Sequence, residues 1–538
     1  MVKNKKTPTF LMNVIMIVFA QIVVKLLGFV YRMVITNIDG FGDIGNGYYN
    51  YGFQIYTLLL AISSIGIPNA ISKLVSERCA LDDFKGAMRI FRVALVLFSI
   101  VGAIFSAAMF FGAQLIATEL LSSPPAVHTI RVLSPAILFV SVSSVIRGFF
   151  AGQHNMKATN TSQVIEQFLK CISTILIVIA IVGSSPEYMA AGATLATTIS
   201  TALSLVYLYF FYMANRKQLK EKQLSAPALK LEGNSKKIAK TILLVSIPIS
   251  LGAIVASLNR VIDIVTIGRC LKTAFAGDGL AAKALNDKVI GLQGILSKTD
   301  VLVNLPLALN TAFSTVLVPT VAGALAVKDY DTARQKISFS LLVSTVVALP
   351  CAIGYISLAG PILQTIYPNA SDGALIFTLV APTVFFSAMS QTIYGSLQGM
   401  GKIFVPALSV LCGGIVKVIL NLILIPIPAI NIYGAPIGSI ACQATAFAIS
   451  FIVLRKNLPM KLSFTKYFLK PLAAAVIMGG AAVLVQPLMS RFTGNAVATL
   501  CAIGFGCLIY FALVIVLGIF SREELSALPI IGKRFKNN

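Results

Sequence analysis

Long apolar stretches recur along the chain from Phe10 to Phe520, and short polar segments separate them. A helix needs about 20 mainly apolar residues to cross about 30 Å of hydrocarbon. The stretches that reach this length are 10–35, 47–72, 90–114, 129–151, 160–183, 187–213, 239–266, 296–324, 337–359, 373–396, 404–427, 432–455, 466–487 and 495–520. The pattern predicts an all-α integral membrane protein with fourteen transmembrane helices.

Composition supports a membrane protein and excludes a nucleic-acid-binding one. Of the 538 residues 57% are hydrophobic and 12% are charged, whereas soluble domains carry about 25% charged residues. The net charge of +24 suggests nucleic acid at first. However, no basic patch alternates with aromatic residues as it does in nucleic-acid-binding modules. No nucleic-acid partner is therefore expected.

The basic residues are distributed unevenly between the two sides of the predicted membrane. Most lie in the tails and in the even-numbered turns. Those of the opposite turns are few: Arg131, Arg269, Lys272, Lys283, Lys288 and Arg491. The positive-inside rule then predicts a multi-pass protein of the cytoplasmic membrane with both termini in the cytosol. The basic loops would face anionic lipid of the inner leaflet.

The two halves of the chain repeat each other. The segment GFFAGQHNM (148–156) aligns with GSLQGMGKI (395–403) at an offset of 247 residues. At this offset the matched residues are Gly148 with Gly395, Gly152 with Gly399, Ser162 with Ser409 and Lys170 with Lys417. Pro68 matches Pro319 and Arg32 matches Arg260 after allowance for a longer loop at 270–290. Each repeat holds an even number of spans, so we expect two parallel six-helix lobes around a central cavity.

The repeat also predicts the domain boundaries. We expect an N-terminal six-helix lobe over 1–213 and a basic cytosolic linker over 214–238. A C-terminal six-helix lobe should follow over 239–455, and two further helices with a cytosolic tail should occupy 456–538.

A polar stripe runs along the first predicted span. Gln21, Lys25, Gly28 and Arg32 follow one another at steps of four, three and four, which puts them on one side of a helix. A cation at the centre of a bilayer costs about 2.5 to 3.5 kcal/mol. The stripe should therefore face protein or a watery cavity, and it indicates that something polar and anionic crosses the membrane.

Other spans carry polar residues at helical spacing. Glu166 precedes Lys170 by four residues, the favourable order for an intrahelical ion pair. Further polar positions at helical spacing inside spans include Gln163 and Gln167, then Asn259, Arg260 and Asp263, then Lys298, Asp300, Asn304, Thr311 and Thr315, then Lys417 and Asn421.

Two interpretations of these residues remain open. Charged groups near span ends can extend to the interface instead of lining a cavity. The Glu166–Lys170 pair can simply brace its helix. Tyrosines near the outer end of the second span are expected to be interfacial anchors: Tyr48, Tyr49, Tyr51 and Tyr56.

The sequence offers little for catalysis. The in-span acids are Glu166, Asp263 and Asp300, which form no paired motif. The eight cysteines show no metal-ligand spacing, and no GxxxxGK[ST] phosphate-binding loop occurs. We therefore expect no enzyme, no catalytic residue, no metal site and no cofactor.

Several segments resemble one family of transporters: KLLGFVYR (25–32), GYYNYGFQIY (47–56), GIPNAISKLVSE (66–77), IRVLSP (130–135), RGFFAGQHNM (147–156), SQVIEQFLK (162–170), LQGMGK (397–402) and NLILIPIP (421–428). They are similar to stage V sporulation protein B and its relatives, the polysaccharide-biosynthesis transporters of Gram-positive bacteria. These in turn resemble MurJ-type lipid II flippases of the multidrug/oligosaccharidyl-lipid/polysaccharide exporter superfamily.

The resemblance implies a flippase that moves an undecaprenyl-diphosphate-linked glycan, above all lipid II, by alternating access. It implies a cationic central cavity and a groove for the lipid tail at spans thirteen and fourteen. Residues expected to bind substrate are Lys25, Arg32, Arg147 and Arg260, with Gln21 and Lys298. An arginine that such flippases carry on span two meets apolar residues here, near Leu60 and Ala61.

The resemblance also bears on coupling. Asp263 matches an aspartate that helps to hold sodium in some relatives, and Asn421 matches one of its partners. Lys417 stands where another partner would be an asparagine. We hypothesise that the Lys417 ammonium replaces the cation and pairs with Asp263. The residues expected in coupling or internal ion pairs are thus Glu166, Lys170, Asp263, Asp300, Lys417 and Asn421.

Three questions stay open at this point: the energy source, the cargo and whether the protein transports at all. The energy source is Na⁺ or H⁺ coupling or the membrane potential. The cargo is lipid II, another lipid-linked polysaccharide, or a drug exchanged for a cation. A role as a scaffold for cell-wall synthesis enzymes, in growth or in sporulation, would not need charged stripes inside spans.

Overall fold

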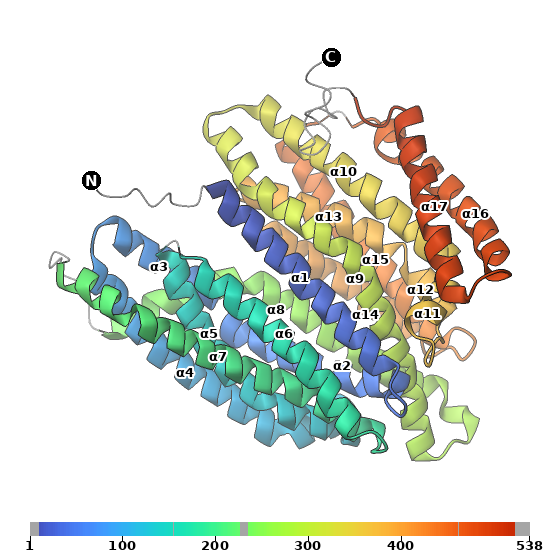
Figure 1. Ribbon diagram of the computed structural model, residues 1–538, viewed down its shortest axis with the longest axis horizontal. Coiled ribbons are helices and arrows are strands. Elements are labelled where there is room, and N and C mark those ends of the chain that lie inside the picture. The colour runs from blue at the N-terminus through green and yellow to red at the C-terminus, as the bar shows by residue number, and fades with distance from the viewer. Residues whose placement is uncertain (1–9, 154, 226–234, 461, 522–538) are drawn as a thin grey trace. The chain divides into compact units, whose positions relative to one another are not determined.

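The computed structural model describes residues 10–153, 155–225, 235–460 and 462–521. In this part of the chain every regular element is helical (Figure 1). The helices are α1 (Phe10–Thr36), α2 (Gly42–Leu60), α3 (Ile67–Ala80), α4 (Phe84–Leu115), α5 (Val127–Gly152), α6 (Lys157–Ala180), α7 (Pro186–Ser225), α8 (Ser235–Ala274), α9 (Ala282–Ala326), α10 (Tyr330–Ser357), α11 (Ala359–Ile366), α12 (Ala374–Val380), α13 (Thr383–Gly399), α14 (Phe404–Leu424), α15 (Gly434–Asn457), α16 (Lys470–Ser490) and α17 (Asn495–Val516).

The helices confirm the predicted membrane fold. Within the described residues twelve helices are long and apolar enough to span a membrane, or up to thirteen if a bent pair in α9 counts as one span. α1, with 27 residues, coincides with the first predicted span. Each of the fourteen predicted stretches falls on helices. The predicted second span is divided between α2 and α3, and the predicted tenth span between α12 and α13.

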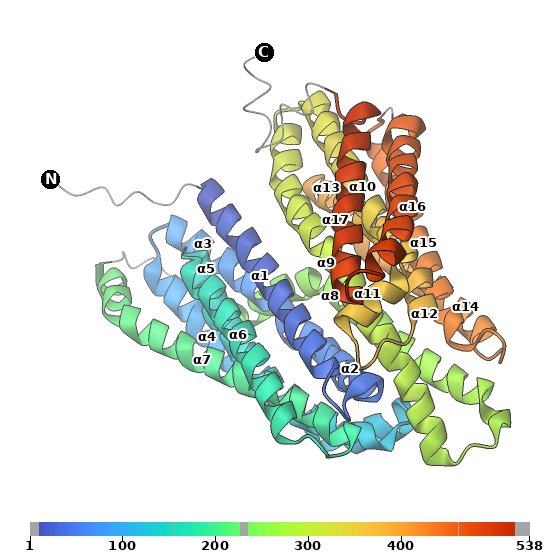
Figure 2. The same cartoon turned by 45° about the vertical axis from the view of Figure 1, so that its right-hand side comes forward.

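The chain divides into two compact units, Met1–Ser297 and Lys298–Asn538, which we call unit 1 and unit 2. Unit 1 contains α1 to α8 and the first part of α9. Unit 2 contains the rest of α9 and α10 to α17. In unit 2, α16 and α17 pack side by side, and α16 lies along α10 (Figure 2).

The four tyrosines near the start of α2 are buried, so the expectation that they are interfacial anchors is wrong. Tyr48, Tyr49, Tyr51 and Tyr56 are at most 4% exposed. Burial is tolerated because hydroxyl groups find polar partners inside unit 1. Tyr51 accepts a hydrogen bond from Gln293 Nε2 at 2.7 Å, which satisfies a polar tip on an otherwise apolar ring.

The packing of two helix pairs repeats between the units. In unit 1 a Cβ atom added at Gly152 of α5 would lie 2.7 Å from Val75 Cβ of α3. In unit 2 a Cβ atom added at Gly399 of α13 would lie 2.9 Å from Val321 Cβ of α9. Both contacts are too close for any side chain but hydrogen, so glycine permits the same close approach in each half.

This packing corrects one match of the predicted repeat. Pro68 packs against Gly148, and Ser314 packs against Gly395 in the same manner. The counterpart of Pro68 is therefore Ser314 and not Pro319. The sequence match was misleading because it paired two prolines by residue type. The feature that repeats is the position on the neighbouring helix that the glycine contacts.

A break in the helix recurs at the same place in both halves. In unit 1 a π-helical turn, Ala61–Ile65, separates α2 from α3. In unit 2 α9 bends by 41° between Ala282–Ala308 and Phe313–Ala326. Turns of this kind mark interruptions of the regular hydrogen-bond ladder and often lie near functional sites.

Candidate substrate-binding site

A polar stripe on α2 organises the charged residues of unit 1. Asn46, Asn50 and Gln54 follow one another at steps of four and therefore share one face. Arg32 Nη1 donates to Asn46 Oδ1 at 3.0 Å, and Arg260 Nε donates to Gln54 Oε1 at 3.0 Å. Sequence reasoning missed this stripe, although the repeated spacing of three amides in an apolar span would have shown it.

Arg32 is buried, with only 7% of its surface exposed. Its Nη2 donates to Ser297 Oγ at 2.9 Å, and the guanidinium lies 4.3 Å from the ring centroid of Tyr49. The Tyr49 hydroxyl is 3.0 Å from the Tyr31 hydroxyl. Neutral groups thus surround this cation, in keeping with the prediction that it faces protein rather than lipid.

Two of the predicted substrate ligands are more accessible. Lys25 of α1 is exposed. Arg260 of α8 is also exposed and donates from Nη2 to Ser257 Oγ at 2.8 Å. Because both cations keep an open side, both are able to meet a ligand. The side chain of Gln21 lies outside the described residues.

The structure corrects the predicted pairing of Glu166. Its Oε2 atom accepts a hydrogen bond from Arg147 Nη2 at 2.7 Å, an ion pair between α5 and α6. Arg147 also donates to Ser162 Oγ at 2.9 Å and to Ser204 Oγ at 3.0 Å. Helical spacing indicated Lys170 as the partner because a single helix does not reveal an arginine on its neighbour.

Lys170 instead faces aromatic rings of α1 and α2. Its ammonium nitrogen lies 5.3 Å from the ring centroid of Tyr31 and 4.7 Å from that of Phe53. The side chain is buried, with 5% exposed. Cation–π contacts of this kind stabilise a desolvated cation by about 2 kcal/mol, and they leave its charge uncompensated.

In unit 2 the predicted site residues lie in different surroundings. Lys298 is 1% exposed, and its ammonium donates to the carbonyl of Ala370 at 2.5 Å. Asp300 is exposed on α9. Asn304, Thr311 and Thr315 continue this exposed polar face along the same helix.

The predicted coupling residues are divided between the units. Asp263 is half-buried in unit 1, whereas Lys417 and Asn421 belong to α14 of unit 2. Asn421 is fully buried, and a Cβ atom at Gly438 of α15 would lie 2.6 Å from its Oδ1. The pairing of Lys417 with Asp263 stays a prediction.

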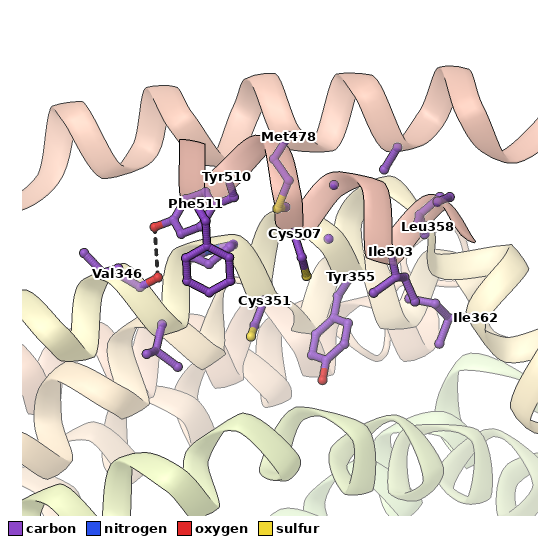
Figure 3. Close-up of a pocket in the computed structure, with 16 residues that line it drawn as sticks. Val346, Cys351, Tyr355, Leu358, Ile362, Met478, Ile503, Cys507, Tyr510 and Phe511 are labelled. Atoms are coloured by element: carbon purple, nitrogen blue, oxygen red, sulfur yellow. Dashed lines mark hydrogen bonds between the residues drawn. The ribbon is translucent and has the colours of Figure 1, made fainter. Parts of the chain in front are cut away.

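Unit 2 also contains an apolar cavity of about 340 Å³ between α10, α11, α16 and α17 (Figure 3). Residues that line it include Val346, Cys351, Tyr355, Met478, Tyr510 and Phe511. Its two tyrosine hydroxyls are satisfied by the backbone, since Tyr355 donates to Leu302 and Tyr510 to Val346, each at 2.9 Å. Such a cavity suits a hydrocarbon chain and not a polar ligand.

No group of three or more His, Cys, Asp or Glu side chains that could hold a metal ion occurs among the described residues. The polar groups that contact one another around Arg32 and Arg260 are cations, amides and hydroxyls, which bind anionic and hydroxyl-rich ligands.

Known proteins resemble this chain over nearly its whole length. It is 25% identical to "Stage V sporulation protein B" of Bacillus subtilis (strain 168) over 525 residues, 98% of each chain. It is 24% identical over 489 residues to "Lipid II flippase MurJ" of the same organism, 87% of each chain. These relatives confirm the resemblance drawn from the motifs.

Solved structures agree in fold. An inward closed conformation of lipid II flippase MurJ has a TM-score of 0.68 at 16% identity, covering 93% of this chain and 98% of that one. An inward-facing multidrug resistance MATE family transporter has a TM-score of 0.66 at 14% identity, covering 82% and 98%. At these identities the likeness concerns the fold.

A family model supplies the assignment. The model described as "Polysaccharide biosynthesis protein" matches residues 10–325, which is more than half of the chain and includes every described residue of the polar network of unit 1. The chain therefore belongs to the polysaccharide biosynthesis protein family.

Proposed function

We propose that this protein is a flippase of the cytoplasmic membrane and not an enzyme. Its cargo is an undecaprenyl-diphosphate-linked glycan, with lipid II for peptidoglycan synthesis as the substrate. Such a molecule combines a diphosphate, a glycan and a long hydrocarbon tail. Alternating access would carry the polar head through protein while the tail stays in lipid.

One observation carries the proposal: unit 1 holds cations inside apolar helices without matching acids. Within the described residues, Arg32, Lys170 and Arg260 contact no carboxylate, and Glu166 is already engaged by Arg147. Uncompensated cations are costly in hydrocarbon. A diphosphate would supply the missing negative charge through charge-assisted hydrogen bonds.

Lys25 and Arg260 are the proposed first contacts because they are exposed. Arg32 is the proposed inner ligand, and Gln21, four residues before Lys25 in the sequence, stays a predicted ligand. The cavity of unit 2 supports the lipid part of the proposal, since its apolar walls suit a polyprenyl chain. The relatives support the glycan part, since one is named a lipid II flippase.

The experiment follows outward exposure of labelled lipid II in a flippase-depleted bacterium that expresses this chain. The wild type should restore exposure. The double variant Lys25→Ala, Arg260→Ala should lower the rate at least about tenfold, because each lost phosphate contact removes about 1.5 to 3 kcal/mol. Normal exposure at normal protein levels would remove both residues from the site.

The matched control is Arg334→Ala. Arg334 forms an exposed ion pair with Asp331 at 2.7 Å at the start of α10, and such pairs contribute little. The control should transport at the wild-type rate. Rescue by another lipid-linked glycan, with lipid II unmoved, would change the substrate and keep the flippase. Efflux of a cationic drug alone would favour an exporter instead.

A further inference from the structure

The ion pair between Arg147 and Glu166 determines whether the positive charge of Lys170 is neutralised by a carboxylate. Glu166 lies four residues before Lys170 on α6, the spacing at which a carboxylate neutralises a lysine. Its Oε2 atom is taken by Arg147 at 2.7 Å instead. Ser162 and Ser204 fix the arginine from two further positions, at 2.9 and 3.0 Å.

Lys170 is consequently left facing the aromatic corner of α1 and α2. The rings of Tyr31 and Phe53 flank its ammonium. Tyr49, whose hydroxyl is 3.0 Å from that of Tyr31, carries the guanidinium of Arg32 over its ring at 4.3 Å. Two cations thus share one pair of tyrosines, with no carboxylate in contact with either cation among the described residues.

The internal repeat provides an independent observation. At the offset of 247 residues the counterparts of Arg147 and Glu166 are Tyr394 and Gly413. The lysine, in contrast, is kept as Lys417. In the second repeat no carboxylate lies four residues before Lys417, and no arginine occupies the position that matches Arg147. The arginine therefore accompanies the carboxylate and not the lysine.

We propose that Arg147 is a positioning residue that sequesters Glu166, so that Lys170 and Arg32 remain a cationic corner for the diphosphate of the cargo. The inference rests on the proposed function, and it changes the role expected for Arg147. The guanidinium of Arg147 already donates to three side chains, one of them a carboxylate. It acts on the ligand through Glu166 and Lys170.

The test is a double-mutant cycle with three variants: Arg147→Gln, Glu166→Gln and the two combined. Transport of labelled lipid II is measured in proteoliposomes as kcat and KM. Without Arg147, Glu166 should pair with Lys170. This pairing should raise KM about tenfold, because one charge-assisted contact to phosphate is lost. Glu166→Gln alone should change KM by less than about threefold, and the double variant should return to that level.

A merely structural brace predicts a different pattern. Each single variant would then be equally impaired, and the combination would be no better than either. That result would overturn the proposal. Arg78→Gln serves as the matched control, because it removes another arginine from a carboxylate, Asp83, 3.3 Å away at the end of α3. Its KM should equal that of the wild type.

A second measurement separates this inference from the proposed cargo. Binding of inorganic pyrophosphate to the purified full chain is followed by calorimetry, which requires no flipping. The wild type and the double variant should bind with similar Kd values, and Arg147→Gln should bind about tenfold more weakly. Equal Kd values in all variants would refute the role of Arg147, whatever lipid the protein moves. If lipid II is not transported while the pyrophosphate Kd values are as expected, the result would argue only against lipid II as the cargo.

Discussion

At the scale of single residues, two buried cations of unit 1, Arg32 and Lys170, are held by neutral partners. Arg32 binds an amide, a hydroxyl and an aromatic face, whereas Lys170 lies between aromatic rings. Neutral partners orient a cation and leave its charge available to a ligand. A carboxylate would orient it equally well but would cancel the charge.

The first prediction at this scale concerns Arg32→Lys. Lysine keeps the charge but cannot reach Asn46 and Ser297 together, because it lacks the planar fork of arginine. We expect the free energy of unfolding to fall by about 1 to 3 kcal/mol, the cost of unsatisfied buried polar groups. Thermal unfolding in detergent measures this, and Arg334→Lys at an exposed pair should change it by less than about 0.5 kcal/mol. An unchanged Arg32→Lys protein would show that the network is dispensable.

Residue contacts were the part of the site that sequence reasoning predicted least well. The stripe of α1 indicated that Arg32 faces protein or a watery cavity, and in the structure its side chain is buried. The partner of Glu166 was missed because the ion pair joins two helices. Periodicity reports neighbours within one helix only, and contacts between helices depend on how the helices pack.

At the scale of helices, glycine seams determine how closely neighbours approach. Gly148 and Gly152 of α5 pack against α3, and Gly395 and Gly399 of α13 pack against α9. Small residues permit such close packing between membrane helices, where van der Waals contact drives association. The recurrence of the seam shows that the repeat extends from sequence to packing.

The second prediction compares Gly152→Ala with Gly399→Ala. Each adds a Cβ atom less than 3 Å from a valine Cβ atom, so the helices must separate. Overpacking of this kind costs about 1 to 3 kcal/mol, and thermal unfolding should report a similar loss for both. Gly323→Ala of α9 is the control, because its added Cβ atom has nothing within 4 Å. A loss confined to one half would show that the two seams are not equivalent.

Helices themselves were largely predictable from hydropathy. All fourteen apolar stretches fall on helices, two of them on a pair of consecutive helices, because length and apolarity are dictated by the bilayer thickness. The short helix α11 and the π-helical turn Ala61–Ile65 were not predicted. Neither changes the apolar pattern from which spans are recognised.

At the scale of the whole molecule, the main proposal concerns the energy source of transport. No nucleotide-binding loop occurs in the sequence, and the resemblance drawn from the motifs matches Lys417 to an asparagine that would bind sodium in some relatives. We propose that a fixed ammonium replaces the ion, so that the membrane potential drives transport of the anionic head.

The third prediction follows from this replacement. Exposure of labelled lipid II should be unchanged when sodium is exchanged for choline, and it should fall several-fold when a potassium ionophore removes the membrane potential. Lys417→Asn should make transport depend on sodium, because an asparagine restores a neutral oxygen ligand. A severe loss in the wild type on removal of sodium would contradict the proposal.

The π-helical turn between α2 and α3 has one more consequence. Each residue of an α-helix turns the chain by about 100°, so a single inserted residue sets the rotational phase of everything after it. If that turn tightened to α-helical geometry, Pro68 and Val75 would swing away from the glycines of α5. The five uncharged residues of this turn thus set the rotation of α3 at which it packs against the glycines of α5.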